Sequence, residues 1–248
     1  MLRTRVIPVV LIDGYSVVKT IQFGVRRNQG NPITVARIYN TRNVDELILL
    51  DIDASEQGRS IDLFTIEDIA SECFMPLTIG GGLRSVEDIR AVLEKGADKV
   101  VLNTAALENP ELVRESSHYF GAQCIVGSVD IKKENDRYYV FSKGQVIDRD
   151  PFEWIRKLQD LGAGEIFVNS VDLDGTMTHC DLELISKAVE VSRVPVIYAG
   201  GVASPSDFVA PIQKGVSAVA AASIFHFTRW TPDFCKQELQ KAGIPVRL

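Results

Sequence analysis

Two glycine-rich segments, each followed later in the chain by small or polar residues, could bind an anion. They are Gly80–Gly82 with Asn103-Thr104, and Gly200–Gly201 with Ala222-Ser223. Glycine lets a backbone approach an anion closely, and exposed N–H groups beside hydroxyl or amide donors can cradle a phosphate. A single segment is also compatible with a simple turn. Two segments at matching positions predict two phosphate sites across one mouth, and so a ligand with two phosphoryl groups.

Several carboxylates also stand where predicted strands end. They are Asp51, Asp130, Asp172 and Asp174. Asp130 follows an apolar run, so we expect it in a partly desolvated mouth, where a raised pKa suits a general acid or base. For Asp130 and Asp172 the alternative is a capping or loop carboxylate.

Lys19 lies at the start of a long connection, residues 19–31, that has no clear periodicity. Long connections in compact domains often act as lids, and the alternative is a solvated excursion. We expect Lys19 and Asp51 to belong to this substrate-facing region.

Metal and nucleophile patterns are not found in the sequence. His118, His179 and His226 fall in different repeat units, and the four cysteines form no C-x-x-C pair. This spacing predicts no metal site, no disulfide framework and no cofactor. No serine stands in a G-x-S-x-G context, and no nucleophilic triad is evident.

Short apolar strands alternate with amphipathic helices along the chain. The predicted strands are Arg5–Leu11, Glu46–Asp51, Pro76–Ile79, Lys99–Leu102, Cys124–Asp130, Glu165–Asn169, Pro195–Ala199 and Ala218–Ala221, and the predicted helices are 33–43, 59–72, 86–95, 110–119, 152–162, 182–191, 205–214 and 232–242. Eight strands alternating with eight helices predict a closed α/β fold, the (β/α)8 TIM barrel, with an open doubly wound sheet as the alternative.

The two halves of the sequence resemble each other. Pro76–Gly82 resembles Pro195–Val202, and Gly80 and Gly200 are 120 residues apart (200 − 80). A spacing near half the chain predicts one barrel domain over residues 1–248, built from half-barrels of about 1–120 and 121–248. In such a barrel the active site lies at the carboxyl ends of the strands.

Composition limits the classes of function. The chain has 248 residues, 46% of them hydrophobic, and a formal net charge of −6. This charge argues against a broad nucleic-acid-binding face, and no apolar stretch is long enough for a membrane span. The N-terminal segment lacks a signal-peptide cleavage site and runs into a predicted strand, so we expect a cytoplasmic protein.

Over essentially its full length the sequence resembles the cyclase subunit of imidazole glycerol phosphate synthase, HisF. The segments that carry the resemblance are Arg5–Pro8, Asp45–Leu47, Gly80–Gly82, Gly96–Val100, Asn103–Ala106, Asp172–Thr176 and Ala221–Phe227. The resemblance implies a HisH glutaminase partner at the N-terminal face and ammonia transfer through the barrel axis. It also implies a phosphorylated small-molecule substrate, in that family a bisphosphorylated formimino-aminoimidazole ribonucleotide (PRFAR).

The resemblance assigns roles to individual residues. Phosphate contacts match Gly82, Asn103 and Thr104 on one side and Gly175, Gly200, Gly201, Ala222 and Ser223 on the other. A charged ring that gates ammonia matches Arg5, Glu46, Lys99 and Glu165. Asp98 matches a partner-docking aspartate, and Asp130 and Asp174 are the candidate catalytic carboxylates.

One departure from the family pattern bears on the chemistry. The cyclase has a second catalytic aspartate at the end of its first strand, where this chain has Leu11, and Asn169 replaces a threonine. Leucine cannot exchange a proton, and Asp13 is the alternative carboxylate. The sequence thus resembles HisF-like paralogues of surface-polysaccharide genes, which supply ammonia to a sugar-amidating enzyme for an acetamidino group. The alternatives are the histidine-pathway cyclase and a non-catalytic glutaminase activator or ammonia conduit.

Overall fold

Eight parallel strands form a closed barrel in the computed structural model, which describes residues 3–24, 26–42 and 44–247. The barrel strands are β1 (Arg5–Ile12), β4 (Leu47–Asp51), β5 (Leu77–Gly80), β6 (Lys99–Leu102), β7 (Ile125–Glu134), β10 (Glu165–Ser170), β11 (Val196–Ala199) and β12 (Ala218–Ala221). They follow one another in chain order around the barrel, and pairing of β7 with β10 closes it. The predicted (β/α)8 fold is confirmed, and the open doubly wound alternative is wrong.

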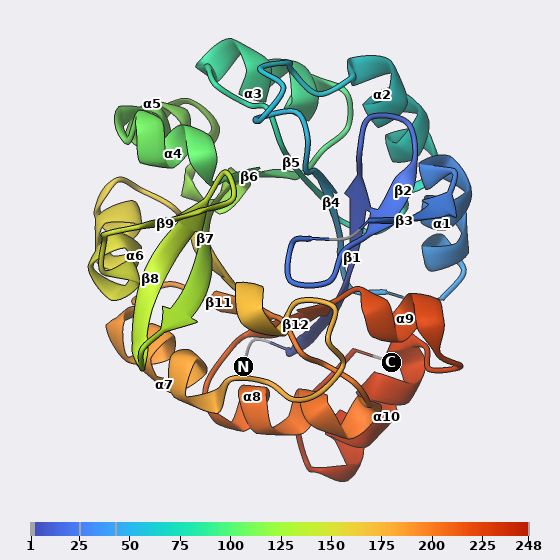
Figure 1. The fold of residues 1–248 in the computed structure, drawn as a ribbon. Coiled ribbons are helices and arrows are strands. Elements are labelled where there is room, and N and C mark those ends of the chain that lie inside the picture. Colours follow the sequence, from blue (N-terminus) through green and yellow to red (C-terminus); the bar gives the residue numbers. More distant parts are fainter. Residues whose placement is uncertain (1–2, 25, 43, 248) are drawn as a thin grey trace.

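Helices surround the barrel strands (Figure 1). The main ones are α1 (Pro32–Asn40), α2 (Leu63–Glu72), α3 (Val86–Glu94), α5 (Glu111–Phe120), α6 (Pro151–Asp160), α7 (Leu182–Val191), α8 (Val209–Gln213) and α10 (Pro232–Lys241). Shorter pieces are α4 (Thr104–Glu108), α9 (Ser223–Phe227) and the 3₁₀ turns η1 (Ala122–Cys124), η2 (Val171–Leu173) and η3 (Pro205–Phe208). Each predicted helix is found within a few residues of its expected bounds. Asn43, the end of the predicted 33–43 helix, lies outside the described residues, as do Met1 and Leu2 of the N-terminal segment.

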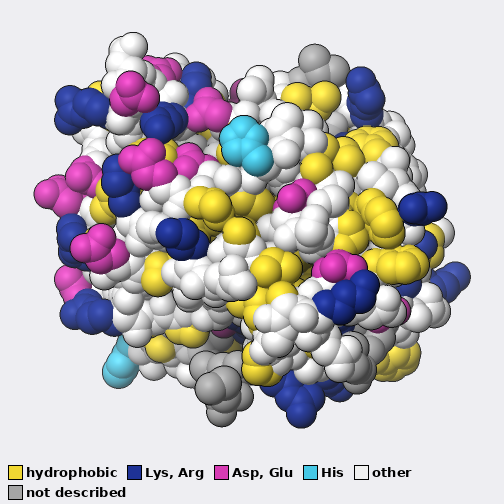
Figure 2. All heavy atoms as spheres, turned by 90° about the horizontal axis from the view of Figure 1, so that it is seen from below, with side chains coloured by type: hydrophobic (Ala, Val, Ile, Leu, Met, Phe, Trp, Pro, Cys, Tyr) yellow, Lys and Arg dark blue, Asp and Glu magenta, His cyan; other side chains and the backbone are white. Residues whose placement is uncertain are grey.

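The core has two layers because helices cover one face of the sheet and the barrel axis is filled on the other. Strands β5, β11 and β12 are buried at every position, which explains the continuous apolar sequences of β11 and β12. Ten buried apolar side chains fill the axis: Ile7, Val9, Ile48, Val101, Val126, Phe167, Ile197, Ala199, Ala218 and Ala220. On the face of the molecule shown in Figure 2, acidic and basic side chains are interspersed. Within the described part of the chain, no helix is long and apolar enough to span a membrane.

Two antiparallel additions project from the mouth of the barrel. β2 (Val17–Lys19) pairs with the end of β1 and with β3 (Arg27–Gly30), so the connection predicted to be irregular contains two short strands. β8 (Arg137–Ser142) pairs with an extended β7 and with β9 (Gln145–Ile147). The two additions lie on opposite sides of the opening (Figure 1).

Tight turns explain the second addition. Asn135 and Asp136 both have positive φ, at 49° and 61°, as do Lys143 and Gly144, at 49° and 73°. Two successive left-handed residues form the turn that suits a two-residue hairpin. The sequence signal for this hairpin was the Asn135-Asp136 pair before a run of aromatic and β-branched residues, and it was not used to predict a strand here.

The two halves use the same backbone path at the mouth. Gly81 and Gly200 have φ of 108° and 122°, and they are 119 residues apart (200 − 81). Ser85 and Ser204 each begin a capping box, again 119 residues apart (204 − 85). The structural partner of Gly200 is therefore Gly81, one residue beyond the Gly80 that sequence comparison suggests.

Candidate functional site at the carboxyl ends of the strands

A cavity of about 580 Å³ lies at the carboxyl ends of the barrel strands. Its lining includes most of the residues assigned to binding or catalysis from the sequence. They are Asp51, Gly82, Asn103, Thr104, Asp130, Asp174, Gly175, Gly200, Gly201, Ala222 and Ser223. Residues far apart in the sequence thus meet in one mouth, where TIM barrels place their active sites.

The first glycine loop follows β5 and has no room for side chains. Gly81 and Gly82 both have positive φ, at 108° and 69°. A Cβ on Gly81 would lie 2.2 Å from the carbonyl oxygen of Asp51, and one on Gly82 would lie 2.5 Å from that of Arg59. The Gly82 N–H donates weakly to Ser55 Oγ at 3.3 Å. The backbone of this loop is therefore directly exposed to the cavity, as a phosphate site requires.

The second glycine loop, after β11, repeats the arrangement. A Cβ on Gly200 would lie 2.9 Å from the carbonyl oxygen of Ser170, which is 119 residues beyond Asp51 (170 − 51). A Cβ on Gly201 would lie 1.7 Å from the carbonyl oxygen of His179. Gly175, with φ of 68°, packs in the same way against Thr20. The two loops follow β5 and β11, which are four strands apart in the eight-stranded barrel, so they face each other.

Asp130 projects into the cavity from β7. Its Oδ2 accepts a 2.7 Å hydrogen bond from Asn103 Nδ2, and Asn169 also donates to its carboxylate. Burial raises the pKa of Asp130 to about 7, although the two amide donors oppose that shift. A carboxyl group with this pKa can give or take a proton near neutral pH, as a general acid or base must.

The raised pKa makes a prediction about stability. The unfolded pKa of Asp130 is near 4, so its ionised form weakens the folded state progressively from about pH 4 to pH 7, by at most about 4 kcal/mol. Asp130→Asn keeps an acceptor for Asn103 and removes this charge. We expect urea unfolding to show the variant more stable than the wild type at pH 8, with little difference at pH 4. An equal difference at both pH values would contradict the assignment.

Leu11 occupies the position in the first half that Asp130 occupies in the second, 119 residues later (130 − 11). It lines the cavity and pairs in register with Leu50, just as Asp130 pairs with Asn169. Leu11, Leu50 and Ala222 pack on the apolar axis. Leu11 and Leu50 of the first half correspond to Asp130 and Asn169 of the second, and Ala222 of the second half corresponds to Asn103 of the first, each pair 119 residues apart. The mouth is therefore polar on one side and apolar on the other.

Asp13 does not replace the missing carboxylate. Its backbone N–H donates to the carbonyl of Ser16 in the turn between β1 and β2. Asp13 is not among the described residues that line the cavity. The alternative carboxylate raised from the sequence is therefore wrong for this conformation.

Asp174 and Lys19 lie near each other beside the cavity and influence each other's charge. Asp174 lines it and accepts from Thr20 Oγ1 at 2.7 Å, and burial raises the pKa of its carboxyl group. Lys19 is only 2% exposed and donates to the Val9 carbonyl at 2.9 Å. Burial lowers the pKa of Lys19 to about 7, and the charge of Asp174 opposes the shift. Lys19 lies behind the described cavity wall, whereas Asp174 reaches its surface.

Asp51 and Asp172 hold loops in place. Both oxygens of Asp51 accept from the guanidinium of Arg59, at 2.6 and 2.8 Å, and Oδ1 also accepts from two backbone N–H groups. Asp172 Oδ2 accepts from the backbone N–H of Lys133 and so ties the extended β7 to η2. The loop-carboxylate interpretation of Asp172 fits this contact. Arg59 was missed from the sequence because an Arg eight residues after a strand-end Asp, within one irregular connection, is not a recognised spacing signal.

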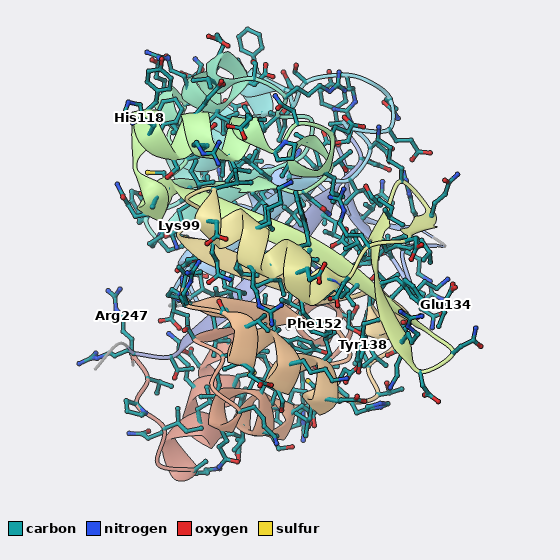
Figure 3. All side chains as sticks on the ribbon, turned by 90° about the vertical axis from the view of Figure 1, so that its left-hand side faces the viewer. Lys99, His118, Glu134, Tyr138, Phe152 and Arg247 are labelled. Carbon is teal, nitrogen blue, oxygen red and sulfur yellow. The ribbon has the colours of Figure 1, made fainter. Side chains whose placement is uncertain are left out.

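A four-residue charge cluster closes the opposite end of the barrel. Arg5 binds Glu46 at 2.7 Å and Glu165 at 2.9 Å, and Lys99 contacts the same two carboxylates at 3.1 Å. Thr78 Oγ1 donates to Glu46 Oε1 at 2.7 Å. Cations and anions thus alternate, which satisfies charges that would be costly alone. Lys99 lies at the opposite end of the molecule from Glu134 of the mouth hairpin (Figure 3).

Asp98 lies next to this floor and is exposed. Its Oδ2 accepts from the backbone N–H of Leu77 at 2.8 Å, which anchors the start of β5. The remaining carboxylate surface faces outward at the N-terminal end of the barrel, where a partner could contact it. No cluster of three or more histidine, cysteine or acidic residues suited to a metal occurs among the residues described.

Fold and site together define a (β/α)8 barrel with glycine loops facing each other across its mouth and a paired-charge floor. A family model of histidine biosynthesis proteins matches residues 5–231. The chain is 45% identical over 248 residues, all of both chains, to hisF2 of Campylobacter jejuni, provisionally named an imidazole glycerol phosphate synthase subunit. It is 42% identical over 252 residues, again with full coverage of both, to imidazole glycerol phosphate synthase subunit HisF of Petrotoga mobilis. The chain belongs to the HisF family.

Proposed function

We propose that this HisF-family barrel is the synthase-type subunit of a glutamine-dependent amidotransferase in the cytoplasm. A HisH-like glutaminase seats on the N-terminal face beside Asp98 and releases ammonia over the charged floor. The barrel carries that ammonia to a phosphorylated small molecule in the mouth. The proposal rests on the family, on the closed charge cluster and on the glycine loops at the other end.

The path between the two ends suits uncharged ammonia. The side chains that fill the axis are apolar, so an ammonium ion or another charged species would lose its hydration without compensation. The charge cluster lies at the entrance to this path. Its ion pairs must break or rearrange before a molecule can pass Arg5, Glu46, Lys99 and Glu165. In the mouth the glycine loops hold the phosphoryl ends of the substrate, and Asp130 moves the proton.

We propose further that the acceptor differs from PRFAR. The observation that carries this is the apolar set Leu11, Leu50 and Ala222 opposite Asp130 and its amides. The HisF cyclase uses an aspartate at the end of its first strand together with the one at the Asp130 position, and here the first-strand position is Leu11. The function that fits best is ammonia supply for an acetamidino group on a surface-polysaccharide sugar, such as an O-antigen sugar, with a sugar-amidating enzyme as third component.

The histidine-pathway cyclase is the second candidate, because Asp130 and both glycine loops are present in the geometry that such a ligand would need. A non-catalytic conduit is the third. Asp130 distinguishes this third candidate from the other two, because a conduit does not need a carboxyl group that exchanges a proton.

Deleting the gene and feeding cells glutamine labelled with ¹⁵N in its amide tests these candidates. We expect growth without histidine and loss of ¹⁵N from the acetamidino nitrogen of the polysaccharide. Histidine auxotrophy with intact polysaccharide would instead establish the cyclase. Complementation with Asp130→Asn then decides between catalysis and conduction, because a conduit restores the label fully.

A further inference from the structure

The two glycine loops face different electrostatic surroundings. Among the described residues that line the cavity, the basic side chains are Arg26 and Lys143, and the acidic ones are Asp51, Glu56, Asp130 and Asp174. Those carboxyl groups that are ionised and unpaired would repel a phosphorylated ligand, so the places of the two cations decide where such a ligand is tolerated.

Arg26 reaches the first glycine loop from one side. It follows Phe23 in the β2–β3 connection, and its Nη1 lies 2.5 Å from Asp53 Oδ1. Ser55, two residues beyond Asp53, accepts from the Gly82 N–H. A Cβ on Gly82 would lie 2.8 Å from Ala54 Cβ, so this loop and the glycine loop are in direct contact. Arg26 is thus tied to the segment on which Gly82 rests.

Lys143 reaches the same site from the other side. It stands at the turn between β8 and β9, next to Ser142, whose Oγ is 3.3 Å from Thr104 Oγ1. Its ammonium group pairs with Glu108 of α4, the short helix that begins at Thr104. The hairpin therefore holds Lys143 beside the Asn103-Thr104 part of the first site.

The second glycine loop has no equivalent cation in the described lining. The lining residues near it are Gly175, Met177, Gly200, Gly201, Val202, Ala221, Ala222 and Ser223. Lys19 precedes Thr20, against which Gly175 packs, but its ammonium group donates to the Val9 carbonyl and is offset by the charge of Asp174. The two glycine loops therefore have the same backbone conformation, but the side chains around them differ in charge.

We propose that Arg26 and Lys143 are phosphate-binding side chains of the first glycine loop, and that this loop takes the dianionic phosphomonoester end of the substrate. The ligand class is then a phosphorylated small molecule bound in one orientation, with its less charged end at Gly201 and Ser223. This deepens the proposed function and rests on its assignment of the mouth to a phosphorylated ligand.

Both cations can offer donors to a phosphate, because the side chains of Arg26 and Lys143 are 39% and 47% exposed. The present partner of Lys143, Glu108, is exposed as well, and breaking such a surface pair changes a binding constant by at most about fivefold. The partner of Arg26, Asp53, is only 11% exposed, so a phosphate shares the guanidinium with Asp53 and does not displace it.

Calorimetric titration of the purified chain with inorganic phosphate tests this inference. Ser223→Ala weakens the second site so that the first is measured, and Thr104→Val does the reverse. We expect Arg26→Gln and Lys143→Gln each to weaken the first site by about three- to fivefold and to leave the second within twofold. Arg27→Gln is the matched control, because Arg27 is an exposed neighbour that is not among the described lining residues, and it should change neither site.

The outcomes separate this inference from the proposed function. Equal weakening of both sites, the same loss with Arg27→Gln, or no loss at all would overturn the role of the two cations while the amidotransferase proposal stands. Failure of the wild type to bind phosphate at either loop would overturn the inference together with the phosphorylated-substrate part of the proposal. If Arg26→Lys, unlike Arg26→Gln, binds phosphate at the first site as tightly as the wild type, the positive charge at this position is what binds the phosphate.

Discussion

With ammonium salt in excess, we expect the chain to cyclise PRFAR about 10²–10⁴-fold more slowly than an enzyme with both acid–base groups. External ammonium removes any dependence on a glutaminase, so a low rate reports on the mouth itself. The reason is Leu11, whose side chain lines the cavity and cannot exchange a proton. Turnover in the ordinary enzyme range of about 1–10³ s⁻¹ would restore the histidine assignment.

Leu11→Asp is the corresponding gain-of-function change. The new carboxylate would lie beside Leu50 and Ala222 in place of the amides that Asn169 and Asn103 offer Asp130. It would therefore have a raised pKa and no amide donor in that set, so we expect at least about a tenfold gain and not full recovery. Leu11→Asn is the control of similar shape without an acid, and it should gain nothing. Adding Asp130→Asn to Leu11→Asp should abolish the gain.

The fold was predictable because its signals are local and repeated. Continuous apolar runs such as 195–199 and 218–221 are what buried parallel strands require, and their alternation with helices leaves few topologies. The glycine loops were predictable for a related reason: Gly81 and Gly200 hold conformations that side chains rarely adopt.

The parts that were missed depend on how irregular connections fold, which residue spacing does not indicate. Arg59 lies only eight residues after Asp51, yet no periodic pattern predicts that its guanidinium binds both oxygens of Asp51. Lys19 was placed in a solvated or lid-like segment, yet pairing of β2 with β1 buries it. The apolar counterpart of the Asp130 site became visible only through register, because Leu50 and Asn169 are equivalent by strand pairing and not by residue type.

Substitutions in the charged floor should uncouple the two half-reactions. In the complex with its glutaminase, Arg5→Ala or Lys99→Ala opens a gap at the axis and leaves Glu46 and Glu165 with one cation instead of two. We expect glutamine hydrolysis to continue while the product formed per glutamine hydrolysed falls severalfold, because ammonia escapes. Product formation from external ammonium, which enters at the open mouth, should be much less affected.

A matched pair of variants separates gating from folding. Lys99→Met removes the charge but keeps a chain of similar length, whereas Lys99→Ala also removes the volume. Leaving a buried charge without any partner costs about 3–5 kcal/mol, and Arg5 still pairs with both carboxylates here, so both variants should lower the free energy of unfolding by less than that. If the floor acts as a gate, Lys99→Ala leaks more ammonia than Lys99→Met at similar stability. A parallel fall of glutamine-dependent and ammonium-dependent activity in both variants would mean that the cluster only stabilises the barrel.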